Sequence, residues 1–242
     1  MNTREYLTDA TKAFFDSLEQ SWKASPPKAL SATSINEYRE NARNFFESTA
    51  LPAEDAQYEC ITIPTMDGQH ISANVYHSIS AKKGRGVLIF YPGGAFIAKL
   101  GAHHSPISHI ANKTDCCIIV PDCRLAPENK FPTGLHDAFC ILNWVYKKGT
   151  ALYGIDPNKI IVGGDSSGGN FAALTAIYAR DNNISLLCQI LISPITDLSR
   201  SLTSFKKEEQ QDILTSPEFV EWAYQHYFPN GFNRKSPQAS FN

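Results

Sequence analysis

The 242-residue sequence lacks an excess of charge of one sign, a long apolar run and C-x-x-C cysteine spacing, and each absence excludes a class of protein. Its 22 basic and 24 acidic residues give a net charge of −2, which argues against nucleic acid or an anionic membrane as a partner. No window approaches the roughly 18 uninterrupted apolar residues of a membrane span. The contents of 43% hydrophobic and 19% charged residues are ordinary for a globular domain.

The N-terminus and the cysteines predict a cytoplasmic location. Residues 1–22 carry charges throughout and lack the apolar core of a signal peptide. None of the six cysteines has C-x-x-C spacing, and most lie inside apolar runs, which predicts buried, reduced thiols and not a disulfide framework. The cysteines inside apolar runs are Cys116, Cys117, Cys140 and Cys188.

Helices precede and follow a region in which strands and helices alternate. Apolar residues three and four apart predict helices over residues 5–22 and Ile35–Phe46. Further helices are expected over Pro106–Lys113, Leu135–Lys147, the stretch from Gly169 onward, Phe205–Asp212 and Ser216–Tyr227.

The strand signals predict a mostly parallel sheet. Met66-Asp67-Gly68 separates two alternating stretches, which predicts a hairpin of Tyr58–Pro64 with His70–His77. Short apolar runs, typical of buried parallel strands, occur at Val87–Tyr91, Cys116–Pro121, Ile160–Gly163 and Leu186–Ser193. Their alternation with helices predicts an α/β fold with a doubly wound sheet.

The stretch around Ser166 carries the clearest chemical signal. Gly164–Gly168 reads G-x-S-x-G, between a buried strand and a helix that starts at Gly169. A serine on so sharp a turn needs small residues two positions before and two after it. The helix N-terminus also directs backbone N–H groups toward developing negative charge. Ser166 is therefore the candidate nucleophile.

A second small-residue loop follows the strand Val87–Tyr91. Backbone N–H groups in such a loop can closely approach a ligand oxygen, so Gly93, Gly94 and Ala95, with the N–H of Ser167, form a candidate oxyanion hole. An ordinary glycine turn is the alternative interpretation of this loop.

Together these motifs resemble the hormone-sensitive lipase-like family of α/β hydrolases, the carboxylesterases and lipases. Pro92–Ala95 matches the family's H-G-G-G, Asp122–Glu128 matches D-x-R-L-A-P-E, and Gly164–Gly169 matches the serine motif. The similarity covers essentially the whole chain. It implies one α/β-hydrolase domain over residues 1–242, with a helical cap formed by residues 1–50 and about 199–235.

The chain departs from the family pattern in two places. Pro92 replaces a histidine whose side chain helps to hold the loop, and Ala95 replaces a glycine, so the resemblance implies a weakened oxyanion hole. The family also takes its catalytic acid and base from turns after the seventh and eighth strands. The sequence stops before either turn, which implies that the C-terminal strands are missing and that Ser166 lacks its usual partners.

Asp197 and His226 are the candidate substitutes, because both follow Ser166 in the order acid then histidine. In the alternative interpretation, Asp197 orders its own turn and His226 lies on a cap helix. Arg124 and Glu128 are expected to tie loops together beneath the site.

A metal site is the other use that the histidines suggest. His103, His104 and His109 could bind a metal with Asp122, but Ser105-Pro106 reads better as the cap and first-turn proline of a helix. We therefore expect neither a metal nor a cofactor.

The sequence favours a serine carboxylesterase that acts on short-chain acyl esters. Two alternatives remain open: a non-catalytic, truncated homologue that binds a small carboxylate, and an amide hydrolase resembling arylformamidases. Without further strands, Leu186–Ser193 would form an apolar sheet edge, which predicts dimers or aggregation.

Overall fold

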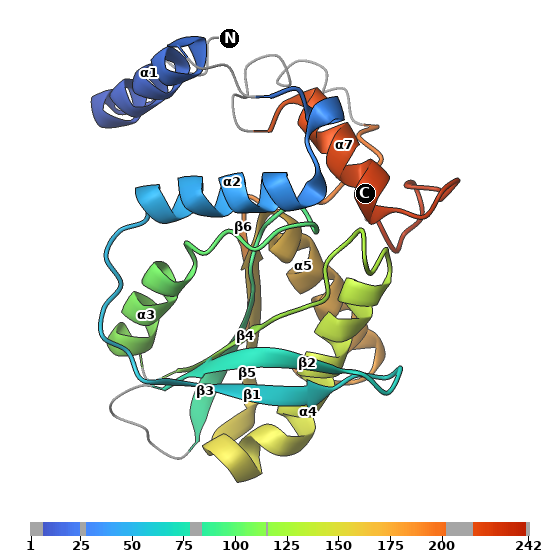
Figure 1. Cartoon of the computed structure of the whole chain (residues 1–242). Helices are drawn as coiled ribbons and strands as arrows, with labels where there is room; N and C mark the ends of the chain where they lie inside the picture. The colour runs from blue at the N-terminus through green and yellow to red at the C-terminus, as the bar shows by residue number, and fades with distance from the viewer. Residues whose placement is uncertain (1–6, 25–27, 78–83, 115, 202–214, 241–242) are drawn as a thin grey trace.

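The computed structural model describes residues 7–24, 28–77, 84–114, 116–201 and 215–240 (Figure 1). The helices are α1 (Asp9–Ala24), the short 3-10 helix η2 (Leu30–Ala32), α2 (Ile35–Thr49), α3 (His104–Lys113), α4 (Thr133–Tyr153), α5 (Ser166–Asp181) and α7 (Pro217–Tyr227). The strands are β1 (Tyr58–Pro64), β2 (His70–Tyr76), β3 (Arg85–Tyr91), β4 (Cys117–Pro121), β5 (Ile155–Asp165) and β6 (Cys188–Ile192). Within the described ranges, no helix combines the length and the apolar character needed to span a membrane.

The six strands form one sheet in the order β1-β2-β4-β3-β5-β6. The strands β4, β3, β5 and β6 are parallel, whereas β2 runs antiparallel to both β1 and β4. The β1–β2 hairpin pairs Pro64 with His70 across the Met66-Asp67-Gly68 turn. The sequence predictions of an α/β fold, a mostly parallel sheet and this hairpin are confirmed.

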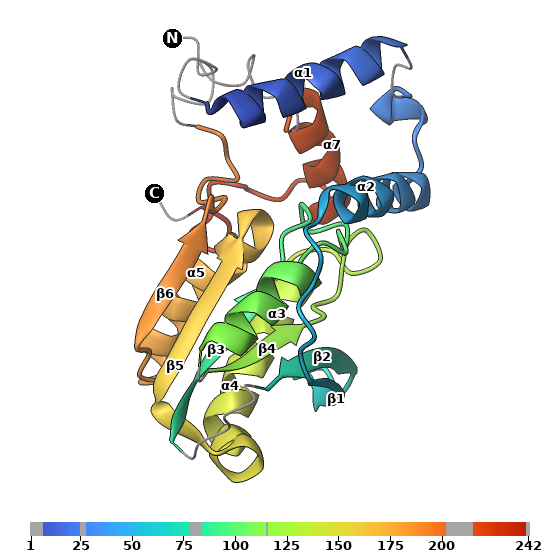
Figure 2. The same cartoon turned by 90° about the vertical axis from the view of Figure 1, so that its left-hand side faces the viewer.

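The core lies at the three central strands, which helices cover on both faces. Ile89, Ile119 and Val162, one from each central strand, are fully buried. Figure 2 shows α3 on one face of the sheet, with α4 and α5 on the other. Because β-branched residues pack well on a sheet covered on both sides, these runs have the sequence signature of central parallel strands.

The helices α1, α2 and α7 lie at the end of the molecule to which the carboxyl ends of the parallel strands point (Figures 1 and 2). Ser34 caps α2, where its hydroxyl accepts a hydrogen bond from the N–H of Glu37 at 3.2 Å. Tyr38 of α2 packs against two rings of α7, with centroid distances of 5.4 Å to Phe219 and 5.2 Å to Trp222. Burial raises the pKa of Tyr38 to about 12.

The strand predicted at Leu186–Ser193 forms as β6, but the prediction that it is buried is wrong. Cys188, Ile190 and Ile192 are exposed, the two isoleucines by 42% and 51%. The physical reason is that β6 is the edge strand of the described sheet and only its α5 face is covered. Cys188 is therefore also wrongly predicted as buried, whereas Cys117 and Cys140 are buried as expected.

Other sequence predictions shift slightly or cannot be compared. The first helix begins at Asp9 and not at residue 5, and the helix predicted over Phe205–Asp212 lies outside the described residues.

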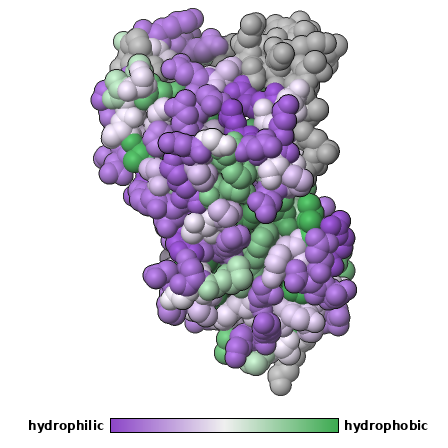
Figure 3. Space-filling model, turned by 90° about the vertical axis from the view of Figure 1, so that its right-hand side faces the viewer, coloured by the Kyte–Doolittle hydropathy of each residue, from purple (hydrophilic) through white to green (hydrophobic). Residues whose placement is uncertain are grey.

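Figure 3 shows one face of the molecule, on which polar side chains surround a central band of apolar ones.

Candidate active site

Ser166 lies on the sharp turn between β5 and α5. Its φ is +52°, a conformation that costs a non-glycine residue energy and that is found at nucleophile elbows. The flanking glycines allow this turn to pack against β3. A Cβ on Gly164 would lie 2.5 Å from the carbonyl oxygen of Tyr91, and one on Gly168 would lie 1.9 Å from the same oxygen. The two small residues expected around the serine are thus required by the backbone of β3.

The loop after β6 holds the elbow from the other side. The N–H of Ile195 donates to the carbonyl oxygen of Ser166 at 3.1 Å, and the buried Asn170 side chain donates to the carbonyl of Ile195 at 2.8 Å. These two bonds fix the turn of Ser193–Ile195 against the first turn of α5.

The loop after β3 places small residues beside the elbow. Ala95 and Phe96 have φ values of +53° and +65°, and the carbonyl of Gly94 accepts from the N–H of Ala98 at 2.9 Å. Within the described residues, no acceptor is recorded for the N–H groups of Gly94, Ala95 and Ser167. These three donors are therefore available to a ligand oxygen.

Gly93 differs from the other candidate donors. Its N–H donates to Oδ1 of Asp165 at 2.8 Å, so this donor is already used. The same carboxylate oxygen lies 2.9 Å from Nε2 of His103. In this conformation the candidate oxyanion hole consists of Gly94, Ala95 and Ser167, and Gly93 instead ties the loop to the residue that precedes Ser166.

Asp197 and His226 each form hydrogen bonds within their own segments. The buried carboxylate of Asp197 accepts from the N–H groups of Ser199 and Ser201, both at 2.9 Å. His226 Nδ1 lies 2.9 Å from the carbonyl oxygen of Trp222, one turn earlier in α7. These contacts agree with the interpretation in which Asp197 orders its turn and His226 belongs to the helix. All seven histidines are described, and none is recorded in a hydrogen bond with the Ser166 hydroxyl.

Arg39 of α2 joins two loops at the site, and sequence reasoning missed it. It donates from Nε to the carbonyl of Ile97 at 2.7 Å and from Nη2 to the carbonyl of Ala126 at 2.8 Å. Its guanidinium also forms a bidentate pair with Glu128, with both contacts at 2.7 Å. This pair lowers the pKa of Glu128 to about 2. The expected loop-tying role of Glu128 is confirmed, and its partner comes from a helix that carries no recognisable motif.

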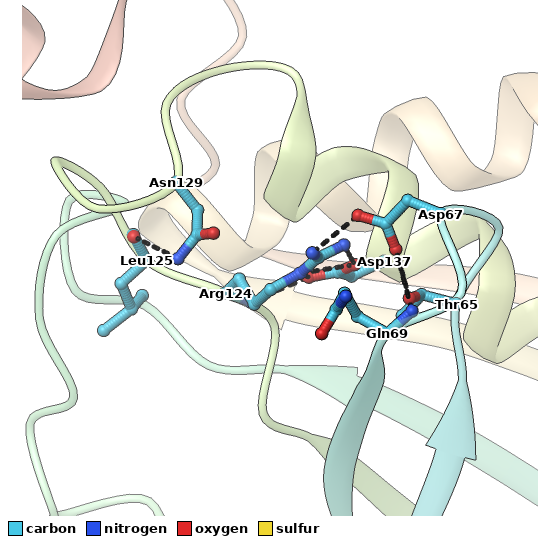
Figure 4. A network of polar contacts seen from close by, with 7 residues as sticks. All are labelled: Thr65, Asp67, Gln69, Arg124, Leu125, Asn129 and Asp137. Carbon is cyan, nitrogen blue, oxygen red and sulfur yellow. Dashed lines mark hydrogen bonds and ion pairs between the residues drawn. The ribbon is translucent and has the colours of Figure 1, made fainter.

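Arg124 ties the loop after β4 to α4 and to the β1–β2 hairpin, as Figure 4 shows. It forms ion pairs with the fully buried Asp137 at 2.6 Å and with Asp67 at 2.7 Å. These hydrogen bonds raise the pKa of Arg124 and hold that of the Asp67 carboxyl well below its usual range. Arg124 is therefore structural, as expected from the sequence.

A cavity of about 490 Å³ lies between α2, β2 and the loop after β4. Charged side chains of α2 and of the loops after β3 and β4 line it, among them Arg43, Lys99 and Asp122. Ser166 is not part of its lining, so we do not assign this cavity to the chemistry of the serine.

The residues considered for metal binding have separate partners. His104 Nδ1 lies 2.8 Å from the Tyr76 hydroxyl, and His109 Nδ1 lies 2.8 Å from Glu54 Oε1. Asp122 pairs with Lys99. Among the described residues, no group of three or more potential ligands converges on one point.

The expected start of α3 is also corrected. The residue at the N-cap is His103, two residues earlier in the chain than the predicted Ser105. The hydroxyl of Ser105 instead donates to the carbonyl of Pro52 at 3.3 Å, which places it against the segment before β1. Ser105 therefore lies inside the first turn of α3, together with Pro106.

Comparison with known proteins agrees with this geometry. Residues 87–242 match the model of a family described as alpha/beta hydrolase fold. The chain is 34% identical over 152 residues to an arylesterase of Saccharolobus solfataricus, covering 61% of this chain and 49% of the relative. It is 30% identical over 210 residues to an ethyl acetate hydrolase of Pseudomonas putida, covering 83% and 65%. The chain thus spans about half to two thirds of the length of these relatives.

Solved structures give the same result. A hyperthermophilic esterase from Pyrobaculum calidifontis superposes with a TM-score of 0.82 at 30% identity, over 94% of this chain and 73% of that one. The family match covers well over half of the chain and includes the serine elbow, the loop after β3 and the loop after β4. The chain therefore belongs to the hormone-sensitive lipase-like family of α/β hydrolases.

Proposed function

We propose that the protein is a carboxylic ester hydrolase in which Ser166 is the nucleophile. The observation that carries this proposal is the position of Ser166, at φ +52° between β5 and α5, beside three backbone N–H groups without a recorded acceptor among the described residues. The names of the similar arylesterase, ethyl acetate hydrolase and esterase support the reaction class.

In the proposed reaction, Ser166 Oγ attacks the acyl carbon of an ester. The N–H groups of Gly94, Ala95 and Ser167 stabilise the resulting oxyanion, the alcohol leaves with a proton, and water then cleaves the acyl-enzyme to release the acid. Removal of one such donor typically lowers kcat by about 10²–10³. The proposal covers short-chain acyl esters and includes no cofactor.

The proposal lacks a general base, because none of the described histidines is hydrogen-bonded to Ser166. A base raises the nucleophilicity of a serine hydroxyl, so a serine without one attacks slowly. We therefore expect slow turnover in which formation of the acyl-enzyme depends on Ser166.

Hydrolysis of p-nitrophenyl butyrate by the purified chain tests the proposal. Ser166→Ala should lower the rate, while Ser48→Ala, at an exposed serine on α2, should leave it unchanged. Circular dichroism would verify that both variants are folded. Equal rates for the wild type and Ser166→Ala would exclude Ser166 as the nucleophile.

A second candidate is a protein that binds a small carboxylate without cleaving an ester. The hydrogen bond of His226 to the carbonyl of Trp222 in its own helix favours it, since none of the described histidines is recorded at the Ser166 hydroxyl. Butyrate binding measured by calorimetry, in the absence of any Ser166-dependent hydrolysis, would support this candidate over the first.

A further inference from the structure

We propose that His103 is a positioning residue that holds the oxyanion loop in place through Asp165. The inference rests on the proposed function only for its kinetic consequence, because the hydrogen bonds themselves can be measured without catalysis. His103 lies outside the motifs at Pro92–Ala95, Asp122–Glu128 and Gly164–Gly169.

One carboxylate oxygen joins the two partners. Asp165 Oδ1 accepts the N–H of Gly93 at 2.8 Å and lies 2.9 Å from Nε2 of His103. Both side chains of the ion pair are largely buried, with 18% of His103 and 27% of Asp165 exposed. A hydrogen bond to a charged group in such an environment is stronger than a neutral bond at the surface.

The position of Asp165 in the chain gives this bond its consequence. Asp165 is the last residue of β5, immediately before Ser166, and Gly93 is immediately before the candidate donor Gly94. A Cβ on Gly93 would lie only 2.4 Å from Asp165 Oδ2, so the loop and the carboxylate are in close contact. The orientation of Asp165 therefore sets the spacing between the nucleophile and the oxyanion donors.

His103 supplies a polar group that the loop itself lacks. Pro92, the first residue of the loop, has no N–H and no polar side chain, so it cannot bind the carboxylate. The neighbouring His104 is not available, because its Nδ1 is 2.8 Å from the Tyr76 hydroxyl. Among the described residues, His103 is the side chain recorded on Asp165, and it reaches the carboxylate from the start of α3.

Removal of the His103 ring should change the Gly93 bond. Asp165 Oδ1 then loses one of its two partners, and the bond that the same oxygen accepts from the N–H of Gly93 changes with it. The groups that face His103 are Asp165 from β5 and the Phe90 ring of β3 at 6.2 Å. Glu47 of α2 contacts the backbone near Gly101, two residues before His103.

Selective isotope labelling can observe this bond directly. Pro92-Gly93 is the only Pro-Gly pair in the sequence, so a chain with ¹³C-carbonyl proline and ¹⁵N-glycine gives a single HNCO peak, that of Gly93. We expect this peak to move in His103→Leu relative to the wild type and to stay in place in His109→Gln. A Gly93 peak at the same position in His103→Leu as in the wild type would overturn the inference.

Kinetics provide a second and separate readout. His103→Leu should slow the reaction of Ser166 with a fluorophosphonate about tenfold, the effect of losing one charge-assisted hydrogen bond. His103→Gln keeps an N–H donor and should restore most of the rate, while His109→Gln, whose ring pairs with Glu54 instead, serves as the control. A rate unchanged in His103→Leu would overturn the positioning role. If Ser166 is unreactive in every variant but the Gly93 peak responds as expected, the proposed function fails and the contact through Asp165 stands.

Discussion

Gly168→Ala tests whether the close contact between the elbow and β3 determines the geometry of the site. The added Cβ would lie 1.9 Å from the carbonyl oxygen of Tyr91 and 2.7 Å from the carbonyl carbon of Pro92. All of these atoms belong to the backbone, so no side-chain rotation can relieve the clash. The elbow and the oxyanion loop must move apart.

The size of this movement follows from the distances. An ordinary van der Waals contact begins at 3.4 Å, so the separation must grow by 3.4 − 1.9 = 1.5 Å. Overpacking of this kind costs about 1–3 kcal/mol of unfolding free energy. A displacement of about 1 Å at catalytic groups lowers the rate by about 10²-fold, so we expect a loss of at least that size.

The assay combines urea unfolding with the rate of Ser166 labelling by a fluorophosphonate. The matched control is Gly86→Ala at the other end of β3, where the nearest atom to the new Cβ is 3.3 Å away. The control should keep its labelling rate and lose less than about 1 kcal/mol. If Gly168→Ala labels as fast as the wild type and unfolds at the same urea concentration, the contact with Tyr91 does not constrain the site.

Three further predictions follow from other parts of the structure. Glu128→Gln should remove the contribution of the ion pair with Arg39, about 1 kcal/mol at neutral pH because the carboxylate is half exposed. The folded pKa of Glu128 is lowered to about 2, so this contribution is present above its unfolded pKa of about 4.3 and is lost as the pH falls toward 2. The unfolding free energies of the wild type and the variant should therefore become equal in acid. A difference in unfolding free energy that stays constant with pH would contradict the ion pair. If wild-type chains associate through the β6 edge, Ile190→Lys should be a monomer by light scattering. Equal masses for the wild type and Ile190→Lys would refute edge pairing. Iodoacetamide should modify exposed Cys188 before Cys117, whose pKa burial raises to about 11, and the reverse order would contradict the described burial.

The sequence was informative where local chemistry determines the structure. The elbow at Ser166 was predictable because the strand, the flanking glycines and the helix start all lie within a dozen residues. The strands β3, β4 and β5 were predictable for a similar reason, since burial on both faces imposes continuous apolar runs. The β1–β2 hairpin followed from its Asp67-Gly68 turn.

The contacts between distant segments were not predictable in this way. Arg39 binds Glu128 across 89 positions of sequence, and His103 binds Asp165 across 62. No periodicity or spacing encodes such pairs, because they depend on how loops at the same end of the sheet fold over one another. The apolar run of β6 alone predicts a buried strand, because such a run looks the same at an edge as at the centre of a sheet. Its edge position was expected only from the comparison with the family pattern.

The most direct test of the account is intact-mass labelling of the purified chain with a fluorophosphonate, beside Ser166→Ala. The account predicts the addition of a single phosphonyl group, slower than in an enzyme with a complete triad, and no addition in the variant. Labelling that persists in Ser166→Ala, or a folded wild-type chain that remains unlabelled after prolonged exposure, would contradict the assignment of Ser166 as an activated nucleophile.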